Sequence, residues 1–164
     1  MPTPESPSSP PNGIEPRQNL YETDFYAWTQ QQGRLLRDRQ WQRLDLFNLI
    51  EEIESLGKQQ RQELRNRLGV LLGHLLKWEY QPQHRSRSWL ATIRVQRRDI
   101  LRLMQENPSL QPYLDEAIQA AYENAKDLAM GETNLPLTAF PEQCSYDAVT
   151  ILDTDFFPGE PSDF

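Results

Sequence analysis

The chain has 164 residues, of which 37% are hydrophobic and 25% charged, and its formal net charge is −7 at pH 7. No run approaches the roughly 18 apolar residues of a membrane-spanning helix, and the single cysteine, Cys144, excludes an internal disulfide bond. The chain also begins without the apolar segment of a secretory signal peptide, so we expect a cytoplasmic protein.

Residues 1–19, MPTPESPSSPPNGIEPRQN, form a proline-rich leader. This stretch has no apolar period and is predicted to be disordered. Between Leu20 and Gln81 the chain contains no proline, which favours long helices, because a proline inside a helix costs about 3 kcal/mol. We therefore divide the chain into the leader, a single helical domain over residues 20–158, and a short C-terminal end over residues 159–164.

The first predicted helix runs from Thr23 or Asp24 to Arg37, with Thr23 as its N-cap. Its apolar residues share one broad face: Phe25, Trp28, Leu35 and Leu36.

A second helix follows a predicted cap at Asp45, in DLFNLIEEIESLG. Its apolar residues recur at helical spacing: Leu46, Leu49, Ile50, Ile53 and Leu56. Gly57 either ends this helix or is tolerated inside a longer one, and the polar residues after it favour a kink or a short break.

The apolar stripe then resumes in a leucine-rich segment, at Leu64, Leu68, Leu71, Leu72 and Leu75. Pro82 ends this helix, because proline disfavours helical geometry at the residue before it. Gly69 and Gly73 form a G-x-x-x-G pair, which outside a membrane indicates only that another backbone approaches closely.

Two further helices complete the pattern. Ser86 or Ser88 caps the first of them, whose buried stripe is Trp89, Ile93, Ile100, Leu103 and Met104. Ser109 is predicted to cap the second and Gly131 to end it. The inward residues of this second helix are Leu110, Leu114, Ala117, Ala121, Ala125 and Leu128, and its alanine spacing indicates a close helix–helix contact.

The acidic C-terminal tail is mostly irregular, with one short helix near Tyr146–Leu152. Phe140, Phe156 and Phe157 are expected to anchor it to the body. No segment alternates as a strand does, so the predicted fold is all-α, a bundle of about five helices.

Four stretches in this order resemble the family called Domain of Unknown Function 29, whose members are mostly cyanobacterial. They are YETDFYAW, DLFNLIEEIESLG, HLLKWEYQPQHRSRSWLATIRVQRRDI and FPEQCSYDAVTILDTDFFP, and together they span about residues 20–158. The resemblance implies an all-helical fold and a bacterial cytoplasmic setting. It implies no activity, substrate or catalytic residue.

Metal and nucleophilic chemistry find little support in the residue pattern. HExxH is absent, Glu-x-x-His pairs are absent, and one cysteine cannot build a zinc knuckle, so we predict neither a metal nor a cofactor. The G-x-S-x-G elbow and the glycine-rich phosphate loop are also absent. Acidic neighbours should raise the pKa of the Cys144 thiol, so we interpret this cysteine as a packing residue.

The strongest binding signal is an arginine-rich corner in HLLKWEYQPQHRSRSWLATIRVQRRD, residues 74–99. Relative to Trp89, Arg94, Arg98 and Arg102 fall on the opposite side of the helix and form an outward ridge. The turn before this helix adds cationic and aromatic side chains. The candidate binding residues are Arg85, Arg87, Arg94, Arg97, Arg98, Trp78, Trp89, His74 and Glu52.

Three hypotheses for function remain open. The first is a helical protein-interaction module, without an assembled catalytic set, that binds another protein or a second copy of itself. The second is a binder of nucleic acid or of a phosphate ligand through the arginine corner; the net charge of −7 and the three lysines count against nucleic acid. The third is an enzyme with a pocket of Glu52, His74 and Arg87. The acidic tail is expected to pair with the arginines of the same chain.

Overall fold

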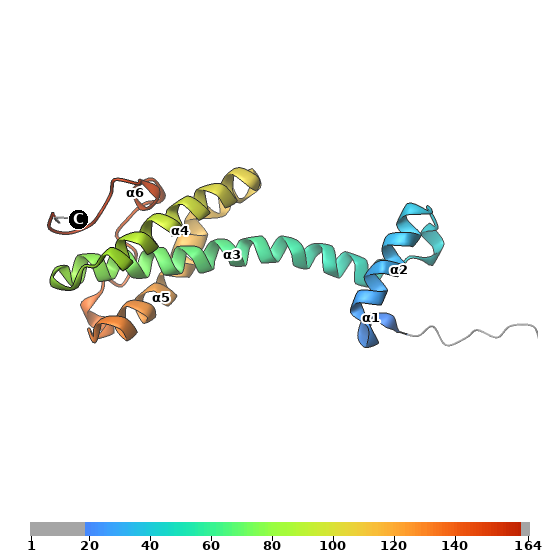
Figure 1. Cartoon of the computed structure of the whole chain (residues 1–164), viewed down its shortest axis with the longest axis horizontal. Coiled ribbons are helices and arrows are strands. Elements are labelled where there is room, and N and C mark those ends of the chain that lie inside the picture. The colour runs from blue at the N-terminus through green and yellow to red at the C-terminus, as the bar shows by residue number, and fades with distance from the viewer. Residues whose placement is uncertain (1–18, 162–164) are drawn as a thin grey trace, which may run out of the picture. The chain divides into compact units, whose positions relative to one another are not determined.

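The computed structural model describes residues 19–161, and these residues form helices, turns and loops without a β-strand, which confirms the all-α prediction. The α-helices are α1 (Leu20–Thr23), α2 (Phe25–Arg37), α3 (Leu46–Tyr80), α4 (Arg87–Glu106), α5 (Leu114–Thr133) and α6 (Ala148–Leu152) (Figure 1). Short 3-10 helices lie at Trp41–Arg43, Pro82–His84, Pro108–Tyr113 and Leu137–Ala139. The predicted disorder of the leader falls outside the described residues, apart from Asn19.

The chain divides into two compact units, Met1–Ile53 and Glu54–Phe164. The prediction of one domain over residues 20–158 stays a prediction. No helix within residues 19–161 is long and apolar enough to cross a membrane.

In the first unit, α1 and α2 pack beside the start of α3. Trp28 and Leu35 are its buried apolar side chains among the described residues. The Trp28 indole donates a hydrogen bond to Asp45 Oδ2 at 3.1 Å, and Gln32 Oε1 accepts one from the Asp45 backbone N–H at 2.9 Å. Asp45 thus joins α2 to the first turn of α3, where its Oδ1 also accepts a bond from the Asn48 backbone N–H, as the predicted cap requires.

The predicted N-cap of the first long helix was wrong. Asp24 caps α2, because its carboxylate accepts the Ala27 backbone N–H at 3.0 Å. Thr23 instead ends α1, and its hydroxyl donates to the Asn19 carbonyl at 3.0 Å. A carboxylate and a threonine hydroxyl are both good caps, so adjacent candidates are hard to separate from sequence.

α3 is a single helix of 35 residues, and it passes Gly57 without a break. Glycine in a helix costs about 1 kcal/mol relative to alanine, which is too little to interrupt a helix that is anchored by packing elsewhere. Of the two alternatives, the short break after Gly57 was therefore wrong, and the kink stays a prediction.

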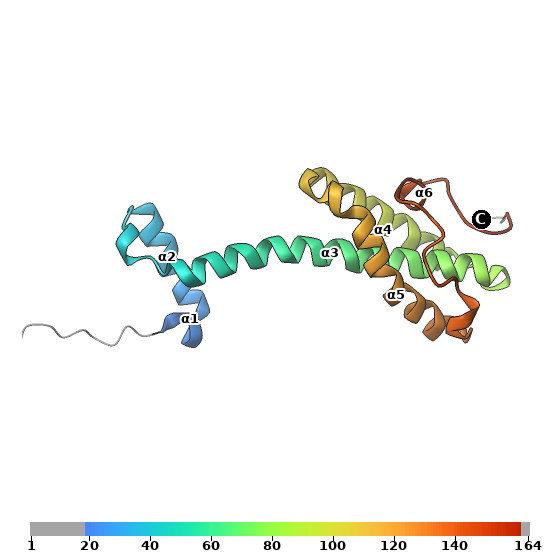
Figure 2. The same ribbon diagram turned by 180° about the vertical axis from the view of Figure 1, so that it is seen from behind.

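The second unit contains the main hydrophobic core. α4 and α5 lie beside the C-terminal part of α3 in both views (Figures 1 and 2). Gly69 and Gly73 face the α5 backbone: a Cβ built on Gly73 would lie 3.2 Å from the Ala125 carbonyl oxygen, and one on Gly69 would lie 3.6 Å from that of Ala121. The glycine pair and the alanine spacing thus mark the same close helix–helix contact.

Both predicted limits of the fifth helix were wrong. A 3-10 helix occupies Pro108–Tyr113, and α5 begins at Leu114 without a side-chain cap from Ser109. Two prolines in this turn lack backbone N–H groups, which explains why regular α-helical bonding begins later. At its other end α5 continues past Gly131 to Thr133, and the residue after it, Asn134, adopts the left-handed conformation (φ 57°) that ends many helices.

Two of the three predicted aromatic anchors contact the body of the protein. Phe157 lies 5.2 Å from Trp78 between ring centroids and Phe140 lies 5.4 Å from Tyr80, both on α3. The ring of Phe156 instead packs on Tyr146, which belongs to the tail itself. The short helix begins at Ala148, two residues later than predicted, after a cap at Asp147.

Candidate functional site

Arg85 holds the end of the tail against the C-terminal end of α3. Its Nε donates to the Trp78 carbonyl at 2.8 Å, and its Nη1 donates to the Glu160 carbonyl at 2.6 Å. Its Nη2 donates to the Pro158 carbonyl at 3.3 Å. All of these acceptors are backbone carbonyls, so Arg85 binds the main chain of the tail and of α3 and not a particular side chain.

Arg97 holds the preceding part of the tail and is 1% exposed. Its Nε donates to the Ile151 carbonyl at 2.8 Å and its Nη2 to the Phe156 carbonyl at 2.7 Å. Its Nη1 has no hydrogen-bond partner among the described residues. Burial lowers the pKa of this guanidinium, while the nearby Asp153 and Asp155 act in the opposite direction.

The burial of Arg97 could have been found from sequence. Counted at 100° per residue from Trp89, Arg97 falls near 80°, next to Ile93 at about 40° on the buried stripe. Arg94 and Arg98 fall near 140° and 180°, on the outer side. The angular position therefore separates one structural arginine from its exposed neighbours.

The expected pairing between the acidic tail and the arginines takes a different form. Between Asn107 and residue 161, carboxylates form two ion pairs, Lys77–Glu132 and Lys126–Glu123; both carboxylates belong to α5, and neither pair involves an arginine. The tail reaches Arg85 and Arg97 through carbonyl oxygens instead. Carbonyls are present at every residue, so composition could not have indicated this contact.

A groove of about 740 Å³ runs along the outer side of α4. We call it the arginine groove; its lining residues are Arg94, Arg97, Arg98, Leu101, Arg102, Gln105, Thr154 and Asp155. Arg94 and Arg98 are exposed and make no hydrogen bond or ion pair within the part of the chain that the structure describes. Arg87 is also exposed, at the start of α4, but does not line the groove.

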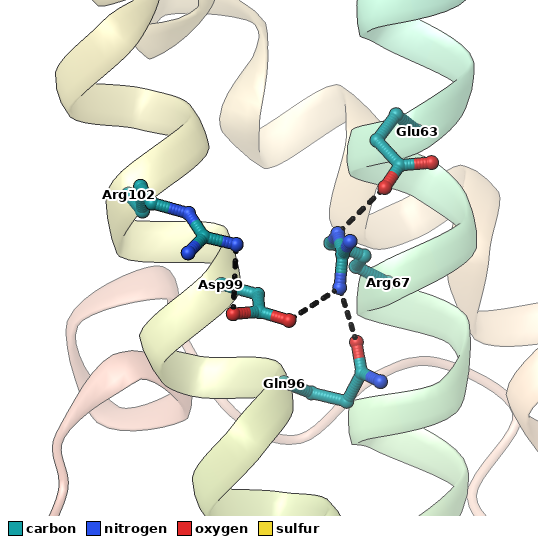
Figure 3. A network of polar contacts seen from close by, with 5 residues as sticks. All are labelled: Glu63, Arg67, Gln96, Asp99 and Arg102. Atoms are coloured by element: carbon teal, nitrogen blue, oxygen red, sulfur yellow. Dashed lines mark hydrogen bonds and ion pairs between the residues drawn. The ribbon is translucent and has the colours of Figure 1, made fainter.

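Arg102 differs from Arg94 and Arg98 because it belongs to a polar network (Figure 3). Its Nη2 lies 3.2 Å from Asp99 Oδ1, and Asp99 Oδ2 lies 2.9 Å from Arg67 Nη1. Arg67 also pairs with Glu63 one turn before it, at 2.7 Å. The network joins α3 to α4 and fixes one end of the groove.

The aromatic and histidine candidates have structural partners. Trp78 is buried, and Trp89 is half-buried with Lys77 Nζ 4.4 Å from its ring centroid. His74 Nδ1 donates to the Val70 carbonyl at 2.9 Å, and burial lowers the pKa of its imidazole. No group of three or more His, Cys, Asp or Glu side chains in residues 19–161 is arranged to hold a metal ion.

Glu52 and Cys144 also have local partners. Glu52 accepts a hydrogen bond from the Tyr21 hydroxyl at 2.7 Å, and this bond is the main reason that the pKa of Tyr21 rises to about 12. Burial raises the pKa of the Cys144 thiol, so the direction was predicted correctly but its cause was not.

A second surface lies on the first unit, on the N-terminal turns of α3. Four apolar side chains there are each more than half exposed, and we call them the α3 stripe: Leu46, Phe47, Ile50 and Ile53. They fall within an arc of about 120° at 100° per residue. α1 and α2 pack on another side of the helix, through Asp45 and Glu52. The sequence predicted this apolar face, but it did not predict that the face is exposed to solvent in the part of the chain that the structure describes.

The pattern of the family described as Domain of unknown function DUF29 matches residues 20–157. The chain belongs to this family. No curated protein and no solved structure matched this DUF29 chain.

Proposed function

We propose that this DUF29 protein is a helical interaction module that pairs with a second copy of itself through the α3 stripe. The observation that carries the proposal is the exposure of Phe47 (72%), Ile53 (66%) and Ile50 (55%) on one face of a helix. Isolated exposed apolar residues are ordinary, but a contiguous stripe of this kind usually marks an interaction site.

The first unit has a small core of its own. Trp28, Gln32 and Leu35 are its buried side chains among the described residues, and Trp28 and Gln32 each form a hydrogen bond with Asp45. A unit of this size gains little stability from so few buried side chains. Covering the α3 stripe in a dimer would add the apolar burial that the unit lacks.

The spacing of the stripe favours a second copy as the occupant. Leu46 and Ile53 lie on either side of Ile50, four and three residues away. In an antiparallel pair with its two-fold axis near Ile50, Leu46 of one copy therefore lies opposite Ile53 of the other, and apolar side chains meet along the seam. A two-fold interface requires this kind of self-complementary patch.

The pairing should be weak and dependent on concentration. Four side chains that each offer roughly 100 Å² give on the order of 800 Å² in a pair, below the roughly 1,200 Å² at which stable specific interfaces begin and in the range of transient ones. Sedimentation velocity on the full chain, from low to high micromolar concentration, should therefore show a monomer that converts to a dimer.

Two substitutions test the surface directly. Ile50→Arg and Ile53→Arg should each leave the protein monomeric at concentrations at which the parent protein dimerises. Val149→Arg is the matched control, because Val149 is 82% exposed but lies in α6, outside the stripe. A parent protein that stays monomeric throughout, or a Val149→Arg variant that dissociates equally, contradicts the proposal. Circular dichroism checks that each variant keeps its helices.

A further inference from the structure

We propose that the arginine groove binds a small phosphate-bearing anion. The groove collects four arginines and one acidic residue, Asp155, although the chain as a whole carries a net charge of −7. A cationic hollow on an acidic protein is a specific local feature, because the average charge of the surface does not produce it.

The two exposed arginines are available to a ligand. Arg94 and Arg98 stand one turn apart on α4 and have no polar partner in residues 19–161. Guanidinium groups bind phosphate oxygens through parallel N–H bonds, and they remain charged at any physiological pH. Thr154, from the tail, also lines the groove.

Arg97 provides a buried positive charge at the same place. Its Nε and Nη2 are used by tail carbonyls, and its buried Nη1 lacks a partner in the described chain. A buried cation that is paired only with neutral acceptors is costly, and Asp153 and Asp155 offset only part of this cost. An anion in the groove would compensate the remaining charge.

The walls of the groove are already ordered without a ligand. The two Arg97 bonds fix residues 151 and 156, and the Asp155 backbone N–H is held by Asp153 Oδ1 at 2.9 Å. On the other side, Asp99 holds Arg102. A ligand therefore meets a tail that is already held, and it has to order chiefly the exposed side chains of Arg94 and Arg98.

The dimensions and charges favour a small ligand over nucleic acid. A volume of about 740 Å³ is within the range of small-molecule sites. A nucleic-acid surface needs a series of phosphate contacts, whereas this cationic groove is local on an acidic chain. A phosphate group carries up to two charges and three acceptor oxygens, which suits converging guanidinium groups better than a single carboxylate does.

Isothermal titration calorimetry on the full chain at low salt tests the proposal, with pyrophosphate and inorganic phosphate as probes and citrate as a carboxylate probe. Pyrophosphate should bind most tightly. Arg94→Gln and Arg98→Gln should each weaken its binding by about five-fold, as expected for one partly solvated charged contact. Arg87→Gln is the matched control, because Arg87 is an exposed arginine of the same helix outside the groove, and its effect should stay below about two-fold.

Several results would overturn the proposal. They are the absence of binding by both phosphate probes, tighter binding of citrate, and an equal loss of affinity in Arg87→Gln. Tighter binding of a single-stranded DNA oligonucleotide that Arg87→Gln also weakens would identify a nucleic-acid surface instead. The Ile50→Arg variant should bind pyrophosphate normally, so this proposal and the self-association proposal can fail separately.

Discussion

The two ends of α3 carry similar apolar stripes, and they differ in what covers them. Leu64, Leu68 and Leu72 are completely buried in the second unit, whereas Ile50 and Ile53 in the first unit are more than half exposed. Both stripes follow the same helical period. The comparison shows that a period identifies the apolar face of a helix, while burial depends on whether another element reaches that face.

Replacing one residue of each stripe with alanine should give the largest difference in the free energy of unfolding. Leu72→Ala should lower the free energy of unfolding by about 3 kcal/mol, because it opens a cavity in a closed core. Ile53→Ala should cost less than about 1 kcal/mol in dilute monomeric protein, since its side chain is mostly solvated. Urea denaturation measures both. Equal losses would mean that the α3 stripe is covered in the monomer.

Adding a methyl group at two glycines of α3, Gly73 and Gly57, should change the stability of the protein in opposite directions. Gly73→Ala should destabilise the protein by about 1–2 kcal/mol, because the new Cβ would meet Leu128 at 2.8 Å and the Ala125 carbonyl oxygen at 3.2 Å. Gly57→Ala should instead stabilise it by up to about 1 kcal/mol, because nothing lies within 4 Å and alanine favours the helix.

Gly69→Ala is the intermediate case for this series. Its Cβ would meet neighbours at 3.6 and 3.7 Å, which is ordinary contact, so the effect should lie between the other two. In thermal melts, the melting temperature should be highest for Gly57→Ala, intermediate for Gly69→Ala and lowest for Gly73→Ala. A destabilising Gly57→Ala would show that a partner packs closely there.

The smallest expected effect concerns the link between α2 and α3 in the first unit. Desolvation raises the pKa of Asp45, but hydrogen bonds from Asn48 and Trp28 outweigh it and hold the pKa below its ordinary value. The resulting stabilisation is present above the unfolded-state pKa and is lost as pH falls through the lower folded-state pKa. It should amount to less than about 1 kcal/mol because the carboxylate is partly solvated.

The indole N–H resonance of Trp28 reports this titration in NMR spectra. It should shift as the solution is acidified into the range in which Asp45 takes up a proton, and Asp45→Asn should remove the shift. An unchanged profile in Asp45→Asn would show that another group controls the Trp28 environment.

The sequence predicted the elements of the fold better than their contacts. The caps at Asp45 and Ser86 and the close approach at Gly69 and Gly73 are local signals, and the structure confirms them. The predicted start of α5 was wrong because Pro112 delays regular α-helical bonding beyond the expected cap at Ser109. The predicted end was wrong because the helix stops at the left-handed Asn134 and not at Gly131.

The candidate site shows the same division between local and long-range information. Sequence identified the arginine-rich segment, and the helical period separates buried Arg97 from exposed Arg94 and Arg98, but it does not indicate which groups bind Arg97. The partners of Arg97 are carbonyls 54 and 59 residues away along the chain. These partners could not be predicted from residue types, because they are far away along the chain and every residue has a backbone carbonyl.

The carbonyl contacts of Arg85 and Arg97 also bear on how the tail can diverge during evolution. Both arginines bind the main chain at Ile151, Phe156 and Glu160, so these bonds survive replacement of the tail side chains. Substitutions at an exposed position such as Glu160 can therefore accumulate while the tail keeps its course. The two arginines, in contrast, have no equivalent replacement, since lysine lacks the forked set of donors that spans two carbonyls.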